Sequence, residues 1–209
     1  MTTVCLEIHT VLALATNARP VQRSLVSLAM ATPDGRQLYA VNADAPIEAV
    51  YTQLPKRIWQ TLPVDEDPVG LDHLDPDVLP LADIKNAFES FIQQTDDPQF
   101  WSLEGNADHR DLIEAFGYYP FGYTGPFHLS PPGLPLWISS IREHRARTLD
   151  SIERRDGKRF PMDAALYLPS VLKPRPGAKN AQRLLTFLQH TDELAQRHGL
   201  PSHLPQAAA

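Results

Sequence analysis

Residues 3–10, TVCLEIHT, decide the fold of this chain. Side chains alternate between the two faces of a β-strand, so Glu7 and His9 point to one face while the apolar residues around them point to the other. A carboxylate and an imidazole are costly to bury in a sheet without partners. The segment is therefore either an edge strand whose polar face meets water or a central strand that carries a functional site.

The composition is typical of a soluble globular protein, with 43% hydrophobic and 21% charged residues among 209. No stretch is long and apolar enough to cross a bilayer and the N-terminus has no charged-then-apolar leader, so we expect a cytoplasmic protein. We expect one domain over residues 1–200 and a frayed tail at 201–209. The single cysteine, Cys5, lies among apolar strand residues and is expected to be a buried structural thiol.

The net charge of −6 conceals a basic segment. Residues 1–140 contain 7 Lys and Arg against 18 Asp and Glu, whereas residues 141–183 contain 11 against 5. Such a segment in an acidic protein suggests a surface for anions, of which nucleic acid is the commonest. The alternative is a solvated helix face on which these cations pair with neighbouring acids. The candidate cations for nucleic-acid binding are Arg142, Arg145, Arg147, Arg154, Arg155, Lys158, Arg159 and Arg175.

The rest of the pattern predicts strands first and helices later. Runs at 24–31 and 37–42 flank an Asp34-Gly35 turn, which predicts three antiparallel strands at the start of the chain. An apolar stripe predicts an amphipathic helix from Asp83 to the acidic break near Pro98. Further predicted elements are a short helix at 47–54, a strand at 100–103, a helix that begins near Asp108, and helices at 136–152, 163–172 and 178–196, with a basic turn at 154–160.

Two loop insertions are expected, near 64–80 and 118–135. The first carries six acidic side chains among prolines and matches no calcium loop, so we expect it to be exposed. The second is rich in aromatic residues, glycine and proline. Aromatic rings beside a basic segment suit base stacking, although such loop rings more often fold back as a small core of their own.

Three short motifs accompany this order of elements: Glu7-Ile8-His9 in the first strand, Trp101 to His109 at a strand-to-helix junction, and Arg175 to Asn180 before the last helix. With the element order, they resemble the DEDDh 3′-5′ exonucleases of the RNase AS and RNase T type. The resemblance implies an RNase H-like α/β fold, with a central mixed β-sheet flanked by α-helices. It places the site at Glu7, His9, Asp108 and Asn180.

In that family, four carboxylates hold two magnesium ions and a histidine acts as general base. Here the resemblance places His9 and Asn180 where carboxylates stand, and Arg175 where the base stands. Two Mg²⁺ ions carry four positive charges, whereas Glu7 and Asp108 supply two negative ones, so we expect one divalent ion at most, or none. The implied metal ligands are Glu7, His9 and Asp108. If the protein is active, the ion is magnesium or manganese, and the imidazole favours manganese or zinc.

Three functions fit these features. The first is an exonuclease-like protein that binds single-stranded RNA or DNA with impaired or absent hydrolysis. The second is an active metal-dependent 3′-5′ exoribonuclease with an altered ligand set. The third is a non-enzymatic structural or interaction protein that reuses the fold to bind a protein partner. The resemblance also implies a homodimer, and no membrane partner is expected. Asp111, one helical turn after Asp108, is expected to be an exposed helix residue or a partner of the helix N-terminal dipole, and not a compensating ligand.

Overall fold

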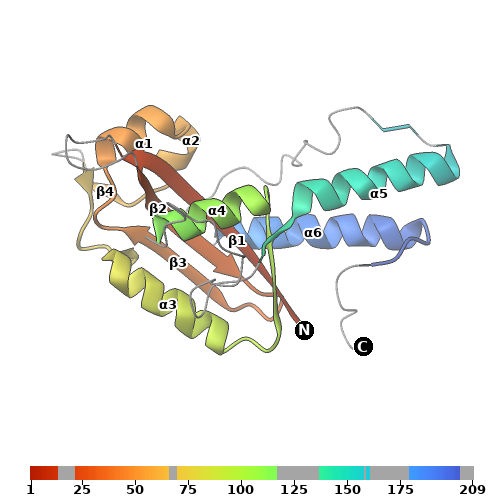
Figure 1. The fold of residues 1–209 in the computed structure, drawn as a ribbon, viewed down its shortest axis with the longest axis horizontal. Coiled ribbons are helices and arrows are strands. Elements are labelled where there is room, and N and C mark those ends of the chain that lie inside the picture. Colours follow the sequence, from red (N-terminus) through yellow and green to blue (C-terminus); the bar gives the residue numbers. More distant parts are fainter. Residues whose placement is uncertain (14–21, 66–69, 117–136, 158, 161–178, 203–209) are drawn as a thin grey trace, which may run out of the picture.

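A six-stranded mixed sheet in the order β6-β3-β2-β1-β7-β8 forms the centre of the protein, and helices flank it (Figure 1). The computed structural model describes residues 1–13, 22–65, 70–116, 137–157, 159–160 and 179–202. The sheet consists of β1 (Thr2–Ala13), β2 (Gln22–Ala31), β3 (Gln37–Asn42), β6 (Val78–Leu79), β7 (Pro98–Ser102) and β8 (Ser139–Ser140). The predicted fold class, a mixed α/β sheet consistent with an RNase H-like domain, is confirmed.

Helices connect and cover these strands, and a small second sheet pairs β4 (Val64–Asp65) with β5 (Gly70–Leu71). The helices are α1 (Ile47–Gln53), α2 (Lys56–Trp59), α3 (Leu81–Gln93), α4 (Asn106–Ala115), α5 (Ile141–Asp156) and α6 (Lys179–Arg197). Across the part of the chain that the structure describes, none of these helices has both the length and the apolar character needed to span a membrane.

β1 is an internal strand. It pairs antiparallel with β2 along most of its length and parallel with β7 over residues 2–5. The edge-strand alternative is therefore wrong for residues 3–5, whereas Glu7 and His9 lie beyond the end of the pairing with β7 and have β2 as their strand partner. A polar pair on such a strand must find its compensation on a face of the sheet.

The two faces of the sheet carry separate cores. Leu6 of β1 belongs to a cluster that includes Phe88 of α3 and Leu112 of α4. Cys5 points the other way and packs against α6. The predicted apolar stripe of the last helix is buried there at Ala181, Leu184, Leu185 and Leu188. Burial also raises the pKa of the Cys5 thiol, which fits the predicted structural role.

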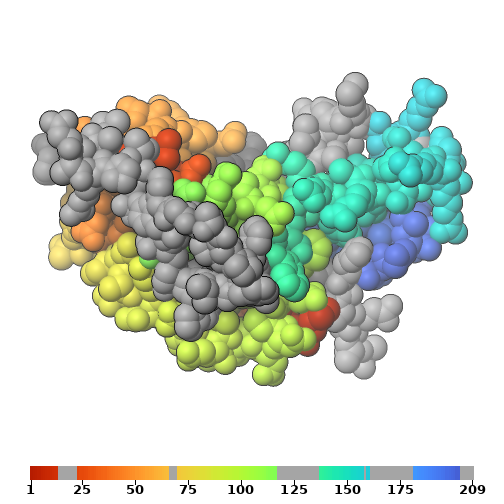
Figure 2. Space-filling view, in the orientation of Figure 1, coloured from red at the N-terminus to blue at the C-terminus, as the bar shows by residue number. Residues whose placement is uncertain are grey.

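α5 and α6 run side by side and project beyond the sheet, as one arm in the space-filling view (Figures 1 and 2). A buried hydrogen bond joins them, with Nε2 of His144 2.9 Å from Oδ1 of Asp192. The guanidinium of Arg145 lies over the ring of Phe187, 4.8 Å from its centroid. These polar contacts fix how the two helices pack on each other.

Some predicted boundaries are wrong. The helix predicted at 136–152 begins only at Ile141, because Ser139–Ser140 form β8 and the Ser140 hydroxyl accepts the N–H of Glu143 as an N-cap. The same helix continues to Asp156, inside the predicted basic turn. Val78–Leu79, in the predicted acidic loop, joins the sheet as β6. The predicted helix at 163–172 and the loop at 118–135 lie outside the described residues.

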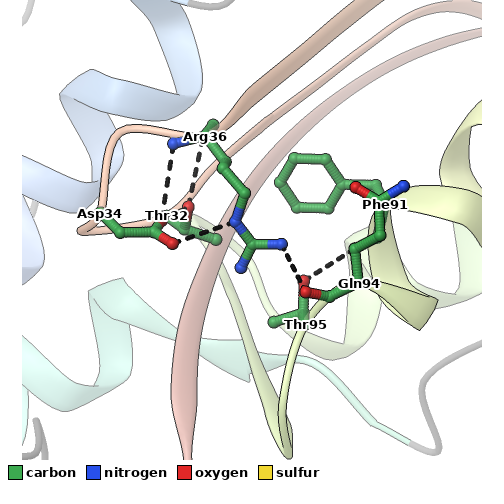
Figure 3. Close-up of polar contacts among 6 residues, drawn as sticks. All are labelled: Thr32, Asp34, Arg36, Phe91, Gln94 and Thr95. Carbon is green, nitrogen blue, oxygen red and sulfur yellow. Dashed lines mark hydrogen bonds and ion pairs between the residues drawn. The ribbon is translucent and has the colours of Figure 1, made fainter.

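The turn between β2 and β3 is fastened to the end of α3 (Figure 3). Nε of Arg36 lies 3.0 Å from the Asp34 carboxylate, and its Nη1 donates to the Gln94 carbonyl at 2.7 Å. The same guanidinium lies over the ring of Phe91. The Thr32 hydroxyl donates to Asp34 and lowers the pKa of that carboxyl, and Arg36 adds to the effect. Arg36 therefore links the hairpin to a helix that lies 58 residues further along the chain.

We expect Arg36→Ala to lower the free energy of unfolding by about 1 kcal/mol, because it removes the hydrogen bond to Gln94 and the ring contact. Urea denaturation followed by circular dichroism measures the change. Arg36→Lys keeps the charge but lacks the forked donors, so its free energy of unfolding should lie between those of the wild type and the alanine variant. An alanine variant as stable as the wild type would contradict this role for the turn.

Candidate functional site

Glu7 and His9 lie in a polar gap between two apolar clusters on the same face of the sheet. On that face of β1, Cys5 packs against α6 and Val11 packs against the cluster around α1. The side chains of Glu7 and His9, between these two positions, keep 18% and 13% of their surface exposed. The helices therefore leave this part of an internal strand partly open.

The His9 ring joins Glu7 to the neighbouring strand. Its Nε2 lies 3.2 Å from Oε1 of Glu7, and its Nδ1 lies 2.9 Å from the hydroxyl oxygen of Ser27, the residue opposite His9 on β2. Ser27 is almost completely buried. Both ring nitrogens of His9 thus have partners inside the protein, and one of the two Glu7 oxygens is used by this contact.

A row of serine, histidine and glutamate is also the composition of a nucleophilic triad. Here the strand context argues against that chemistry. Ser27 lies in the middle of β2, which pairs with β1 on one side and β3 on the other. Backbone N–H groups committed to ladders on both sides cannot form an oxyanion hole beside the hydroxyl. The contacts of His9 with Ser27 and Glu7 therefore serve to pair buried polar groups.

The gap has a negative character. Oε2 of Glu7 is buried and has no hydrogen-bond partner in the described part of the chain. Tyr39 lies on β3, near this gap. Burial raises the pKa of Tyr39, and the negative charges of Asp77, Asp75 and Glu7 raise it further. The phenol therefore stays neutral and supplies no further negative charge.

Asp108 stands in the first turn of α4, directly after the loop that follows β7. Its Oδ2 accepts the backbone N–H of Glu104 at 3.0 Å. Burial raises the pKa of Asp108, and the charges of Asp111 and Glu7 raise it further, while hydrogen bonds from Ser102 and Glu104 oppose the rise. Glu7 and Asp108, two of the predicted ligands, thus lie near enough for their charges to interact.

Gly105 shapes the loop that carries Asp108. Its φ of 61° lies in the region that favours glycine, and a Cβ atom there would lie 2.8 Å from both the Cβ and the backbone nitrogen of Ser140 in β8. The Gly105 N–H donates to the Ser102 hydroxyl, and its carbonyl accepts the first helical N–H of α4. The loop can therefore pass close to β8 only with glycine at this position.

Asp111, predicted to be exposed, instead takes part in an ionic cluster. Nε of Arg23 lies 3.0 Å from Oδ1 of Asp111 and 3.3 Å from Oε2 of Glu114. The Thr10 hydroxyl donates to the other oxygen of Asp111 at 3.2 Å. This cluster ties the ends of β1 and β2 to α4, so the prediction of an exposed Asp111 is wrong.

Sequence reasoning missed two residues of β2: Ser27, which contacts His9, and Arg23, which pairs with Asp111 and Glu114. One signal was available for Ser27. A polar residue within an apolar strand is worth following, although the Asp34-Gly35 turn relates β2 to β3 and does not predict that Ser27 lies opposite His9 on β1. For Arg23 no comparable signal exists, because its partners Asp111 and Glu114 lie about 90 residues away in the sequence.

The arrangement does not fit two magnesium ions. The described residues contain no group of three or more His, Cys, Asp or Glu side chains placed to hold a metal ion. One oxygen of Glu7 faces His9, and the Asp108 carboxylate accepts two hydrogen bonds from its own loop. Asn180, the fourth predicted site residue, belongs to the first turn of α6, but its side chain lies outside what the structure describes.

The predicted nucleic-acid-binding cations follow α5 and do not gather at this gap. Arg142 reaches the loop before α4 and pairs with Glu104. Arg145 is half-buried against α6, and burial lowers its pKa. Arg155 donates to the carbonyls of His198 and Gly199 at the end of α6.

Three further candidate arginines are exposed. Arg147 and Arg154 pair with Glu143 and Asp150, the acids one turn earlier on α5. Arg159 is exposed beyond the helix. Lys158 and Arg175 lie outside the described residues. The basic segment thus combines anchored arginines with exposed ones.

We expect Gly105→Ala to lower the free energy of unfolding by about 2 to 4 kcal/mol, because backbone strain adds to a clash with the main chain of β8. Gly157→Ala is the matched control. Gly157 has a similar φ of 67°, but nothing lies within 4 Å of the added Cβ, so only about 1 kcal/mol is expected. Equal losses in urea denaturation would show that the close approach to β8 is unimportant.

We expect Asp108→Asn to raise the stability of the protein at pH 7 to 8. The pKa of Asp108 is raised in the folded state, so the wild type loses stability as the pH rises from the ordinary aspartate value of about 3.9 through the raised value. The advantage of the amide variant should therefore shrink as the pH falls toward 4. Thermal melts across this pH range test the trend.

Asp111→Asn is the control for this experiment, one helical turn away. It removes one partner of Arg23, so it should destabilise the protein at neutral pH. If Asp108→Asn stabilises the protein and Asp111→Asn destabilises it, the strained carboxylate of α4 is distinguished from the ion-paired one. A loss of stability in both variants would contradict the strain assigned to Asp108.

The exonuclease resemblance rests on the order of elements and on the short motifs that contain Glu7, His9 and Asp108. Neither a scan against models of known protein families nor a search of curated proteins finds a match to this chain. A relationship to exonucleases is therefore a hypothesis that only experiment can test.

Proposed function

We propose that this protein binds single-stranded RNA or DNA through an exonuclease-like fold and hydrolyses it poorly or not at all. The observation that carries the proposal is the contact between His9 and Glu7 on the central strand. Two-metal hydrolysis needs carboxylates that face the ions. Here the imidazole of His9 stands at one of the two carboxylate positions of the strand motif. It also contacts an oxygen of Glu7, the carboxylate at the other position.

Charge supports the loss of two-metal chemistry. Glu7 and Asp108 together supply two negative charges, against the four positive charges of two magnesium ions. The raised pKa of Asp108 means that its surroundings disfavour the ionised form that a metal ion would need. Arg23, which neutralises Asp111, prevents that acid from serving as a replacement ligand.

Nucleic-acid binding does not depend on these carboxylates, because phosphate contacts need only cations. Arg147 and Arg154 are suited to this role since both side chains are more than three-quarters exposed. Their ion pairs along the helix are of a kind worth about 0.2 to 1 kcal/mol in water, so a phosphate can replace the carboxylate at little cost. A strand of nucleic acid bound along α5 would thus keep its affinity without a catalytic centre.

A second candidate is an active 3′-5′ exoribonuclease with the altered ligand set Glu7, His9 and Asp108. The observation that favours it is Oε2 of Glu7, which is buried without a partner in the described chain. An unsatisfied carboxylate oxygen is a position where a single cation could bind. Manganese or zinc would suit the mixed oxygen and nitrogen donors better than magnesium.

Binding and hydrolysis can be measured on the same fluorescent single-stranded oligonucleotide. We expect affinity that weakens as salt rises, and no shortening from the 3′ end with Mg²⁺. Calorimetry should find no pair of tight Mg²⁺ sites. Shortening with Mn²⁺ or Zn²⁺ that is lost in Asp108→Ala would establish the second candidate instead. Absence of binding at low salt would overturn both and leave a protein partner.

The arginine double variant Arg147→Ala/Arg154→Ala tests where the strand lies. We expect weaker binding and a salt dependence reduced by about 0.7 in log-log slope for each lost phosphate contact. Lys56→Ala/Arg57→Ala removes the same charge from exposed positions on α2 and should leave binding nearly unchanged. Equal effects of the two double variants would mean that only net charge matters.

A further inference from the structure

A groove of about 1040 Å³ lies between β7 and α5. It exists because β8 is only two residues long and pairs with no more than Trp101 and Ser102 of β7. The first residues of β7 therefore lack a strand neighbour on that side. The N-terminus, which lies beside the connection from α3 to β7, borders the same groove (Figure 1).

Two tryptophans line the groove and differ in how much of their surface is exposed. Trp101 is buried and packs edge-on against the ring of His144, with 5.5 Å between their centroids. Trp137, immediately before β8, keeps 65% of its surface exposed. An exposed indole at the wall of a groove offers a flat apolar face to a ligand.

The polar groups of the groove also fall into two classes. The hydroxyls of Ser140, Thr148 and Ser151 donate to backbone carbonyls of the protein itself. The side-chain amides of Gln99 and Asn106 make no hydrogen bond to the rest of the described chain. An amide presents a donor and an acceptor side by side, which matches the edge of a nucleobase.

The charges around the groove compensate each other. The N-terminal ammonium faces Asp97 at 3.9 Å, and Arg147 faces Glu143 at 3.5 Å. The groove therefore favours an uncharged ring over a phosphate cluster. An added peptide strand is disfavoured as well, because Pro98 at the open edge of β7 has no N–H to donate.

We propose that this groove binds a base of a single-stranded nucleic acid, which stacks on Trp137 while Gln99 and Asn106 contact its edge. The inference rests on the proposed function and adds a second contact surface to it. Arg147 lines the groove and also belongs to the exposed cations of α5. A strand that follows those arginines thus has one base within reach of Trp137.

Nucleosides and oligonucleotides separate this inference from the proposed function. Adenosine and uridine carry no phosphate, so their binding should be independent of salt and should quench the fluorescence of Trp137. We expect Trp137→Ala to weaken oligonucleotide binding by about 5- to 150-fold and to abolish nucleoside quenching, because each stacked base contributes about 1 to 3 kcal/mol. Trp137→Phe keeps a smaller ring, so its affinity for the oligonucleotide should lie between those of the wild type and Trp137→Ala.

Trp59→Phe is the control for the fluorescence signal. Trp59 belongs to α2, where it packs edge-on against Tyr51 away from the groove, so its loss should leave the quenching intact. Gln99→Ala/Asn106→Ala should weaken nucleoside binding while the oligonucleotide keeps its salt dependence.

The groove proposal is overturned if nucleosides fail to bind the wild type, or if Trp137→Ala binds both ligands as the wild type does. Salt-dependent oligonucleotide binding that survives such a result would leave the proposed function standing. A protein that binds neither ligand would refute both. Circular dichroism of Trp137→Ala confirms that any loss of affinity comes from a folded variant.

Discussion

The contact between His9, Glu7 and Ser27 is the constraint around which this fold is arranged. β1 lies between β2 and β7 in the sheet, and the side chains of Glu7 and His9 point to a sheet face where only 18% and 13% of their surface is exposed. Their compensation has to come from the sheet face itself, and the hydroxyl opposite His9 supplies it at 2.9 Å. α1 and α6 cover that face on either side of the pair and leave it partly exposed. A charged or polar pair is thus kept in the middle of a central strand at the cost of a gap in the helical layer.

The start of α4 shows how two neighbouring acids acquire opposite roles. Asp111 forms an ion pair with Arg23 and accepts a hydrogen bond from Thr10, and it fastens the helix to the ends of β1 and β2. Asp108 lies one turn earlier, where burial and the nearby negative charges disfavour its ionised form. Gly105 allows the preceding loop to pass close to β8, so the position of Asp108 is set by a backbone contact. A carboxylate whose ionised form is disfavoured by rigid surroundings is more typical of a functional site than of a residue that only supports the fold.

Local patterns were enough to predict the hairpin, α3, α4 and α6, because each has an apolar period or a turn signal of its own. The two-residue strands β6 and β8 are too short to have a period, and β8 was predicted as helix for that reason. The site was predicted only in part. Glu7, His9 and Asp108 stand out by residue type, whereas Ser27 and Arg23 matter through partners on other elements. A register shift in the β1–β2 pairing, with Ser27 opposite His9 but Leu25 opposite Thr10, is also invisible to periodicity.

The basic segment shows why net charge in a sequence overstates the charge offered at a surface. Residues 141–183 contain 11 cations against 5 acids, yet Arg142, Arg145 and Arg155 are held by contacts that build the fold. Releasing any of them would expose a carboxylate, an aromatic face or a helix end. Arg147 and Arg154 differ, because water already screens their ion pairs and a phosphate would simply replace one anion by another. Within the described part of this segment, Arg147 and Arg154 are exposed cations of α5, and Arg147 also lines the groove beside Trp137.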